Sequence, residues 1–206
     1  MAFPVHAERH GQGHAERQKG RDWTTSTVRR IGAKVKELRK GKLSAEGLAE
    51  RVSALGYPYS RSALVNLEYG RKRSIDLGEL LVLAAALEVP PMLLLYPDLA
   101  DGPVEALPGV TTTSIRAAQW FGGEEPLTDS ESGAAFDSAS APLTLSRERS
   151  LRERQADFYL RQVPDTRPDL RLAVERAYAT TSVDRKRITQ GMLDAGMTVA
   201  DGEEEQ

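Results

Sequence analysis

The sequence predicts an all-α fold, with a five-helix domain in its first half, a disordered linker and a small C-terminal α-helical segment. Two observations predict this. Apolar residues recur every three or four positions over long stretches, and Ser, Asp and Gly stand where helix ends are expected. The chain has 206 residues, 40% of them apolar and 6% aromatic, so we expect a small core and some disorder. We divide it into a disordered tail (1–25), the five-helix domain (26–97), a linker (98–143), a helical segment (144–197) and an acidic tail (198–206).

Charge is distributed unevenly along this chain. The formal net charge is −2, which by itself argues against a nucleic-acid partner. Between Thr24 and Arg73, however, twelve Lys and Arg residues stand against four Glu residues, so twelve minus four gives this segment +8. A basic segment in a near-neutral chain is typical of proteins that bind a polyanion.

The stretch from Ser60 to Gly70 carries the most specific pattern. Read at about 100° per residue, it puts Ala63, Leu64 and Leu67 on one face, which belongs in a core. Ser60 suits the N-cap, and Gly70 suits the left-handed position after the helix end. The opposite face can hydrogen-bond to base edges in the DNA major groove. We predict base contacts from Arg61, Ser62, Val65 and Asn66, and phosphate contacts from Ser60, Tyr69, Arg71, Lys72 and Arg73.

Over roughly residues 28–97 the chain resembles the Cro and λ-repressor type of helix-turn-helix transcriptional regulators, also called the xenobiotic-response-element type. The resemblance rests on the string Ser-Arg-Ser-x-Leu-x-Asn-Leu-Glu-x-Gly at 60–70. It implies that the helix 60–69 enters the major groove of double-stranded DNA and that the protein acts as a repressor. We also expect a homodimer, because one recognition helix reads too few base pairs for genomic specificity. It also implies a structural ion pair between Arg39 and Glu68, with two independent solvated charges as the alternative.

The first two helices of the domain are expected at about 27–40 and from Ser44. Ile31, Val35 and Leu38 have core spacing in the first, and Leu48, Val52 and Leu55 in the second. The chain departs from the family at Ala45, where a phosphate-contacting glutamine is common, at Gly47, and in a longer turn at 55–59. Tyr57 and Tyr59 are expected to pack under this turn, with DNA-backbone contacts as the alternative.

A fourth helix is expected from Asp76 to Leu87, and a short fifth one within 89–97. The fourth is so apolar that it must close the core or form a dimer face. Within the linker, Trp120 and Phe121 belong to a short helix near 113–121 that either docks on a folded domain or binds a partner. In 144–197, Thr144 or Ser146 should cap a helix, followed by stripes at 170–181 and 188–195.

Other classes of protein are disfavoured by composition. The absence of cysteine removes thiol nucleophiles and cysteine-based zinc sites, and fits a reducing cytoplasm. His6, His10 and His14 would share a helix face, but a solvated tail is preferred over a metal site there. No apolar run is long enough to span a membrane, and the N-terminus lacks a signal-peptide core. Lys186 is the only lysine after Lys72 and lacks an expected dry pocket, so we expect no enzyme, no cofactor and no metal.

The leading hypothesis is therefore a sequence-specific DNA-binding transcriptional regulator that reads the major groove with the helix 60–69. The alternative is an antitoxin-like or other interaction module whose helices in 144–197 bind a protein partner. The two overlap, because antitoxins also bind DNA.

Overall fold

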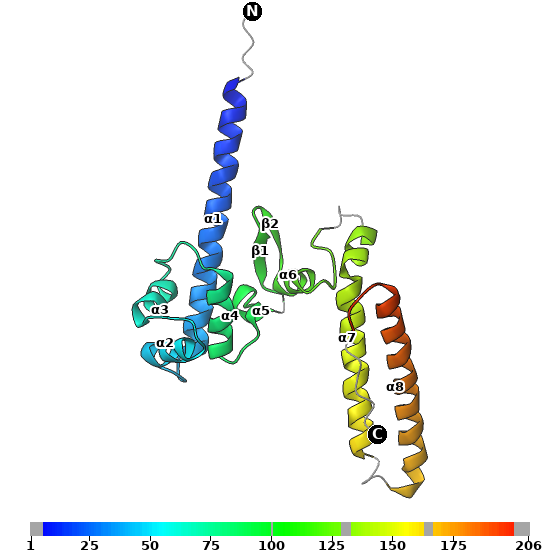
Figure 1. The fold of residues 1–206 in the computed structure, drawn as a ribbon. Helices are drawn as coiled ribbons and strands as arrows, with labels where there is room; N and C mark the ends of the chain where they lie inside the picture. Colours follow the sequence, from blue (N-terminus) through cyan, green and yellow to red (C-terminus); the bar gives the residue numbers. More distant parts are fainter. Residues whose placement is uncertain (1–5, 100, 129–132, 163–166, 200–206) are drawn as a thin grey trace, which may run out of the picture. The chain divides into compact units, whose positions relative to one another are not determined.

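The computed structural model describes residues 6–99, 101–128, 133–162 and 167–199. They are mostly helical, as predicted, and divide into two compact units, one up to Ala118 and one from Gln119. Elements of the first unit are α1 (His6–Arg39), α2 (Ala45–Ala54), α3 (Arg61–Glu68), α4 (Leu77–Ala86), α5 (Pro91–Leu95), β1 (Pro103–Leu107) and β2 (Val110–Thr113) (Figure 1). Helix α6 (Ser114–Phe121) crosses the border, and α7 (Gly133–Gln162) and α8 (Pro168–Asp194) form the second unit.

Side-chain caps start α2, α3 and α4 at the positions that the sequence predicted. Ser44 Oγ accepts from the Gly47 amide at 2.9 Å, and Ser60 Oγ accepts from the Ala63 amide at 3.1 Å. Asp76 caps α4 in the same way, by accepting from the third amide beyond it. Each such cap contributes about 1 kcal/mol, so the helix starts are encoded locally.

The core of the first unit lies among α1 to α5. Its fully buried members include Ile31, Val35, Leu48, Val52, Leu64, Leu67, Leu83 and Leu94. The prediction that Leu55 belongs to the core is wrong, because α2 ends before it and its side chain is 54% exposed. Helix α4 closes the core with Leu80 and Leu83, while Leu77 and Leu81 stay exposed. The short fifth helix is confirmed as α5.

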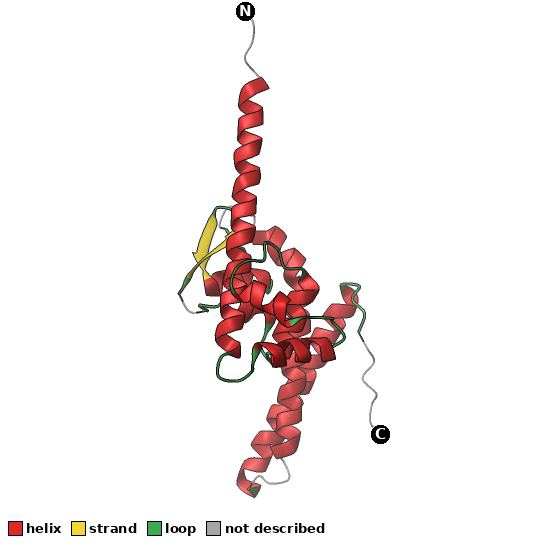
Figure 2. Cartoon of the chain, turned by 90° about the vertical axis from the view of Figure 1, so that its left-hand side faces the viewer, coloured by secondary structure: helices red, strands yellow, loops and turns green. Residues whose placement is uncertain are grey.

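The prediction of a disordered tail at 1–25 is wrong for the described residues, since α1 begins at His6. Extending a helix whose later turns are already packed adds one backbone hydrogen bond per residue without a new nucleus. Long-range contact also holds it, because Trp23 Nε1 donates to the Glu105 carbonyl at 3.0 Å. Figure 2 shows the helix continuing well past its neighbours. The side chains of His6, His10 and His14 lie outside the described part.

The prediction of a disordered linker at 98–143 is also wrong for the described residues, which form β1, β2, α6 and the start of α7. Strands β1 and β2 pair antiparallel, from Pro103 opposite Thr113 to Leu107 opposite Val110. Gly109 has φ +79° in the turn between them. A two-stranded hairpin is marginal alone, but Val104 and Ala106 are buried here. The predicted short helix near 113–121 is confirmed as α6, with Ala117 and Ala118 buried. Its Ile115 and Phe121 remain exposed.

The second unit is an antiparallel pair of long helices, which lie side by side in Figures 1 and 2. The prediction that Thr144 or Ser146 caps a helix is wrong, because α7 starts at Gly133. Both hydroxyls instead donate to carbonyls one turn earlier in the same helix. Helix α8 runs unbroken to Asp194 and buries Ile188 and Met192.

Residues 200–206 of the predicted acidic tail lie outside the described part. Within it, no helix combines the length and the hydrophobicity needed to cross a lipid bilayer.

Candidate nucleic-acid interface

Helix α3 is held closely against α1. Gly32 faces the backbone at the end of α3, where an added Cβ would lie 2.8 Å from the carbonyl carbon of Leu67 and closer still to its oxygen. Only glycine allows this approach, because a methyl group would overlap the α3 backbone. Leu64 and Leu67 anchor the same side of α3 in the core, with no exposed surface. The opposite face of α3 is therefore fixed toward solvent.

The predicted base-contacting side chains lie on that face. Arg61, Ser62 and Asn66 are exposed, and Val65 is half-buried. The Arg61 Nε lies 3.9 Å from the Glu46 carboxylate, and both side chains are more than half exposed. This contact is long and solvated, so it holds the guanidinium only weakly. The structure thus brings the four predicted base-contacting residues together on one helix face.

The N-terminus of α3 links the cap to this face. Ser60 Oγ lies 2.9 Å from Ser62 Oγ while accepting from the Ala63 amide. Ser60 is itself exposed at the first turn, beside Arg61. A phosphate contact from Ser60 would therefore coexist with its capping role.

A tight backbone turn follows α3 and positions the basic residues after it. Gly70 has φ +66°, its amide donates to the Leu67 carbonyl at 3.0 Å, and the Arg71 amide donates to the Asn66 carbonyl at 2.9 Å. This is the Schellman pattern, which satisfies the last carbonyls of a helix. Arg71 and Arg73 leave the turn exposed.

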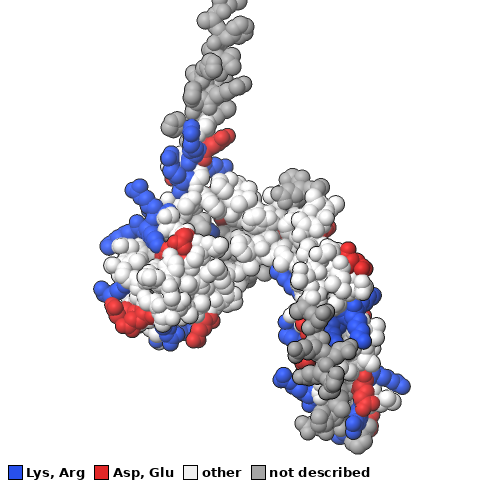
Figure 3. All heavy atoms as spheres, in the orientation of Figure 1, with Lys and Arg blue, Asp and Glu red and all other residues white. Residues whose placement is uncertain are grey.

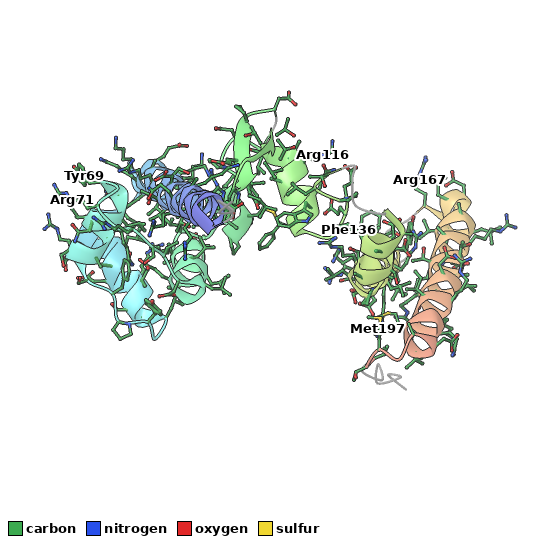
Figure 4. All side chains as sticks on the ribbon, turned by 90° about the horizontal axis from the view of Figure 1, so that it is seen from above. Tyr69, Arg71, Arg116, Phe136, Arg167 and Met197 are labelled. Carbon is green, nitrogen blue, oxygen red and sulfur yellow. The ribbon has the colours of Figure 1, made fainter. Side chains whose placement is uncertain are left out.

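Tyr69 lies at the centre of a basic cluster. The ammonium of Lys36 sits 3.8 Å from the Tyr69 ring centroid, and the Arg71 guanidinium 5.7 Å from it. Figure 4 shows Tyr69 and Arg71 next to each other at the outer edge of this unit. Such cation–π contacts keep cations close to one another despite their repulsion.

Sequence reasoning did not assign Arg29 and Lys36 to the site. Arg29 lies against Gly70, where an added Cβ would come 3.0 Å from Arg29 Cγ. The available signal was their spacing: seven residues apart on α1, they share a face beside the buried Ile31 and Val35 stripe. In Figure 3, Lys and Arg side chains follow the edge of the unit beside α1 and α3.

The predicted ion pair between Arg39 and Glu68 is confirmed. Arg39 donates from Nε and Nη2 to the two carboxylate oxygens at 2.6 and 2.9 Å, and from Nη1 to the Leu43 carbonyl at 3.0 Å. The Glu68 side chain is 2% exposed. The hydrogen bonds to Glu68 raise the pKa of Arg39 above its ordinary value, despite the opposing effect of burial. This fork fixes the end of α3 to the end of α1.

Lys72 does not behave as its two neighbours do. Its ammonium is paired with the carboxylate of Glu79, whose side chain is 1% exposed. Tyr59 donates its hydroxyl to the other oxygen of Glu79 at 2.6 Å. Removing Lys72 would leave a buried carboxylate without its cation. Lys72 therefore has a structural role in this unit, and its phosphate contact stays a prediction.

The two tyrosines of the 55–59 turn also serve the fold. Burial, followed by the hydrogen bond to Glu79, raises the pKa of Tyr59 far above its ordinary value, so its hydroxyl stays a donor. Tyr57 donates to Asp76 Oδ2 at 2.9 Å, and both rings pack against the core. The expectation that they pack under the turn is confirmed. This packing connects the turn before α3 to the start of α4.

Among the described residues, no group of three or more acidic or histidine side chains is placed to hold a metal ion. No family model, no curated protein and no solved structure matches this chain. The resemblance to the Cro and λ-repressor type thus stays a prediction from the residues.

Proposed function

We propose that the first unit is a helix-turn-helix domain of a sequence-specific DNA-binding transcriptional regulator, acting as a repressor, with α3 as its recognition helix. One observation carries the proposal. Helix α3 holds Leu64 and Leu67 fully buried on one face and Arg61, Ser62 and Asn66 exposed on the other. A short helix braced in this way can present hydrogen-bonding groups to a DNA groove in a fixed geometry.

The proposed base contacts follow from side-chain chemistry. Arg61 would donate to O6 and N7 of a guanine, and Asn66 would pair with N6 and N7 of an adenine. Ser62 would add a weaker hydrogen bond, and the half-buried Val65 an apolar contact with a thymine methyl. Each half-site should therefore contain a guanine and an adenine a few base pairs apart.

Phosphate contacts would come from both ends of α3. Ser60 lies at its start, and Tyr69, Arg71 and Arg73 lie at its end with exposed side chains. Such contacts release condensed counterions, so affinity should fall with salt. With about six phosphates neutralised, log K should fall against log salt with a slope near −5. A flat salt response would contradict groove docking.

A homodimer on DNA is part of the proposal, because one recognition helix reads too few base pairs for genomic specificity. Two copies would read half-sites about one helical turn apart. Leu77 and Leu81 on α4, 67% and 46% exposed, are candidates for the dimer surface. Sedimentation of the full chain, alone and with Leu77→Ser/Leu81→Ser, tests this surface. If the wild-type chain stays monomeric on its operator, the dimer proposal fails.

The experiment that tests the function is selection of bound duplexes from a random DNA pool by the purified full chain. The proposal expects enrichment of a two-fold symmetric site whose halves contain the guanine and the adenine. Arg71→Ala/Arg73→Ala should weaken binding to all sequences alike, because phosphates carry no sequence information. If the pool shows no enrichment above chance, sequence-specific DNA binding is contradicted.

A second candidate is an interaction module whose helices in 144–197 bind a protein partner, as in an antitoxin. The supporting observation is the exposed apolar surface of α7 and α8, where Phe158 is 58%, Leu172 56% and Val183 66% exposed. Leu172 and Val183 share a helix face at 100° per residue, since they are eleven residues apart. If Leu172→Ser/Val183→Ser abolishes partner capture while DNA selection is unchanged, this surface serves protein binding.

A further inference from the structure

We infer that the exposed part of α1 before the core, together with Arg73, forms a second phosphate-binding surface, which contacts double-stranded DNA flanking the segment that α3 reads. This inference rests on the proposed DNA-binding function and extends it to a part of α1 that lies outside the recognition helix.

The surface begins as an open groove beside α1 in the first unit. Arg17 and Arg21 line it from α1, Arg73 lines it from the loop after α3, and Pro108 lines it from the hairpin turn. Asp22 is the acidic side chain in the lining, so three cations minus one anion leave the groove at +2. Both α1 arginines are exposed.

Among the side chains that the structure describes, neither arginine pairs with a carboxylate. Arg17 Nε donates to the Gly13 carbonyl one turn earlier at 2.9 Å, and Arg21 donates to Gln18 at 3.2 Å. Asp22 instead accepts from Gln18 Nε2 at 2.8 Å. The remaining guanidinium N–H groups can therefore donate to phosphate oxygens, which match their planar fork.

Arg73 connects the groove to the basic cluster at α3, because it lines the groove and lies two residues after Arg71. Along α1 itself, the buried Val28 and the packing of Gly32 on α3 separate Arg17 and Arg21 from Arg29 and Lys36. Figure 3 shows basic side chains continuing upward along α1.

The side of α1 that faces the hairpin is held by other contacts. Trp23 donates to the Glu105 carbonyl, and Lys19 reaches Gly109 in the turn of the hairpin. These contacts hold this part of the helix in place, although its first buried core residue is Val28. Arg17 precedes Val28 by eleven residues, about 16 Å along the axis, which places it beyond the footprint of a short recognition helix.

The test compares two duplexes, the selected site trimmed to its ends and the same site with about 15 base pairs of added flank on each side. Wild-type full chain should bind the flanked duplex about tenfold or more tightly at 0.1 M salt. Arg17→Ala/Arg21→Ala should remove that advantage and make the salt slope shallower by about 1.8 for each bound copy, since each copy no longer neutralises two phosphates. The variant should bind the trimmed duplex as the wild type does.

Three variants control for charge and folding. Arg176→Ala/Lys186→Ala removes the same charge from exposed positions of α8 and should leave the flank advantage intact. Arg17→Lys/Arg21→Lys keeps the cations and should restore most of the advantage. Asp22→Asn keeps the acceptor for Gln18 but removes the anion, so it should strengthen binding to the flanked duplex.

The outcomes separate this inference from the proposed function. If Arg17→Ala/Arg21→Ala keeps the wild-type affinity and slope on flanked DNA, the inference is overturned and α3 readout stands. The same follows if the variant loses equal affinity on both duplexes, because the arginines would then act within the site. If the wild type selects no DNA, both proposals fall. Binding to an acidic protein without any flank dependence would also overturn it.

Discussion

Gly32→Ala should weaken the first unit by separating α1 from α3. The new Cβ would lie 2.8 Å from the carbonyl carbon of Leu67, whereas carbon atoms prefer about 3.5–4.0 Å, so the helices must part by about 0.7–1.2 Å. Overpacking of this kind costs about 1–3 kcal/mol, and a backbone neighbour cannot rotate away. Alanine regains about 1 kcal/mol of helix propensity. Because the clash is with backbone, we take an overpacking cost of about 3 kcal/mol, so the free energy of unfolding should fall by about 2 kcal/mol in total.

The matched control is Gly20→Ala in the same helix, where an added Cβ meets nothing within 4 Å. It should stabilise the helix by up to about 1 kcal/mol. The assay is urea unfolding followed by Trp23 fluorescence in a Trp120→Phe background, so that the signal reports the first unit. With a slope of about 2 kcal/mol per molar, Gly32→Ala should lower the midpoint by about 1 M. Equal midpoints for the two variants would refute the close approach of α1 and α3.

Three further predictions concern the polar contacts that fix α3. Arg39→Ala should lower the free energy of unfolding in urea by about 3–5 kcal/mol, because Glu68 would stay buried without its partner. Arg39→Met/Glu68→Leu should recover most of this lost stability, since it removes both charges. If the double variant recovers no stability, the ion pair is not desolvated. Lys72→Ala should lower the thermal midpoint because the buried Glu79 carboxylate would lose its cation, and Lys72→Ala/Glu79→Gln should lower it less. An unchanged midpoint in Lys72→Ala would mean that Lys72 does not stabilise the fold. Hydrogen bonds from the Glu79 amide and then from the Tyr57 hydroxyl lower the pKa of Asp76 below its ordinary value of 3.8. The stabilisation from the Asp76 carboxylate is therefore fully present above pH 3.8 and is lost as the pH falls through the lowered pKa. Asp76→Asn should remove this loss of thermal stability in acid, and a pH profile equal to that of the wild type would contradict the prediction.

What depends on local sequence could be predicted. The caps at Ser44, Ser60 and Asp76 and the left-handed Gly70 follow from a side chain and the few amides next to it. The α3 faces follow from helical period alone, because the two leucines of the buried face recur at three-residue spacing. Even the Arg39–Glu68 pair came from the family resemblance, whose specific string is itself local.

What depends on distant contacts could not be predicted. The polar start of α1 carries no apolar stripe, and its anchor is Trp23 bound to a carbonyl 82 positions away. The hairpin around Pro108-Gly109 was missed, because the acidic and Gly-rich composition of 98–143 indicated disorder. Lys72 stands between two arginines of the same charge, and only folding brings the buried Glu79 to it. Composition describes exposed segments poorly when one tertiary contact decides their state.

The central claim is that α3 reads base sequence through Arg61. The most direct measurement is a titration of Arg61→Ala against the selected site and against scrambled DNA of the same length and salt. We predict a loss of about 1–3 kcal/mol on the selected site, roughly 5- to 150-fold in affinity, with relaxed base preference at one position and little change on scrambled DNA. An equal loss on both DNAs would make Arg61 a phosphate contact and contradict the orientation of α3.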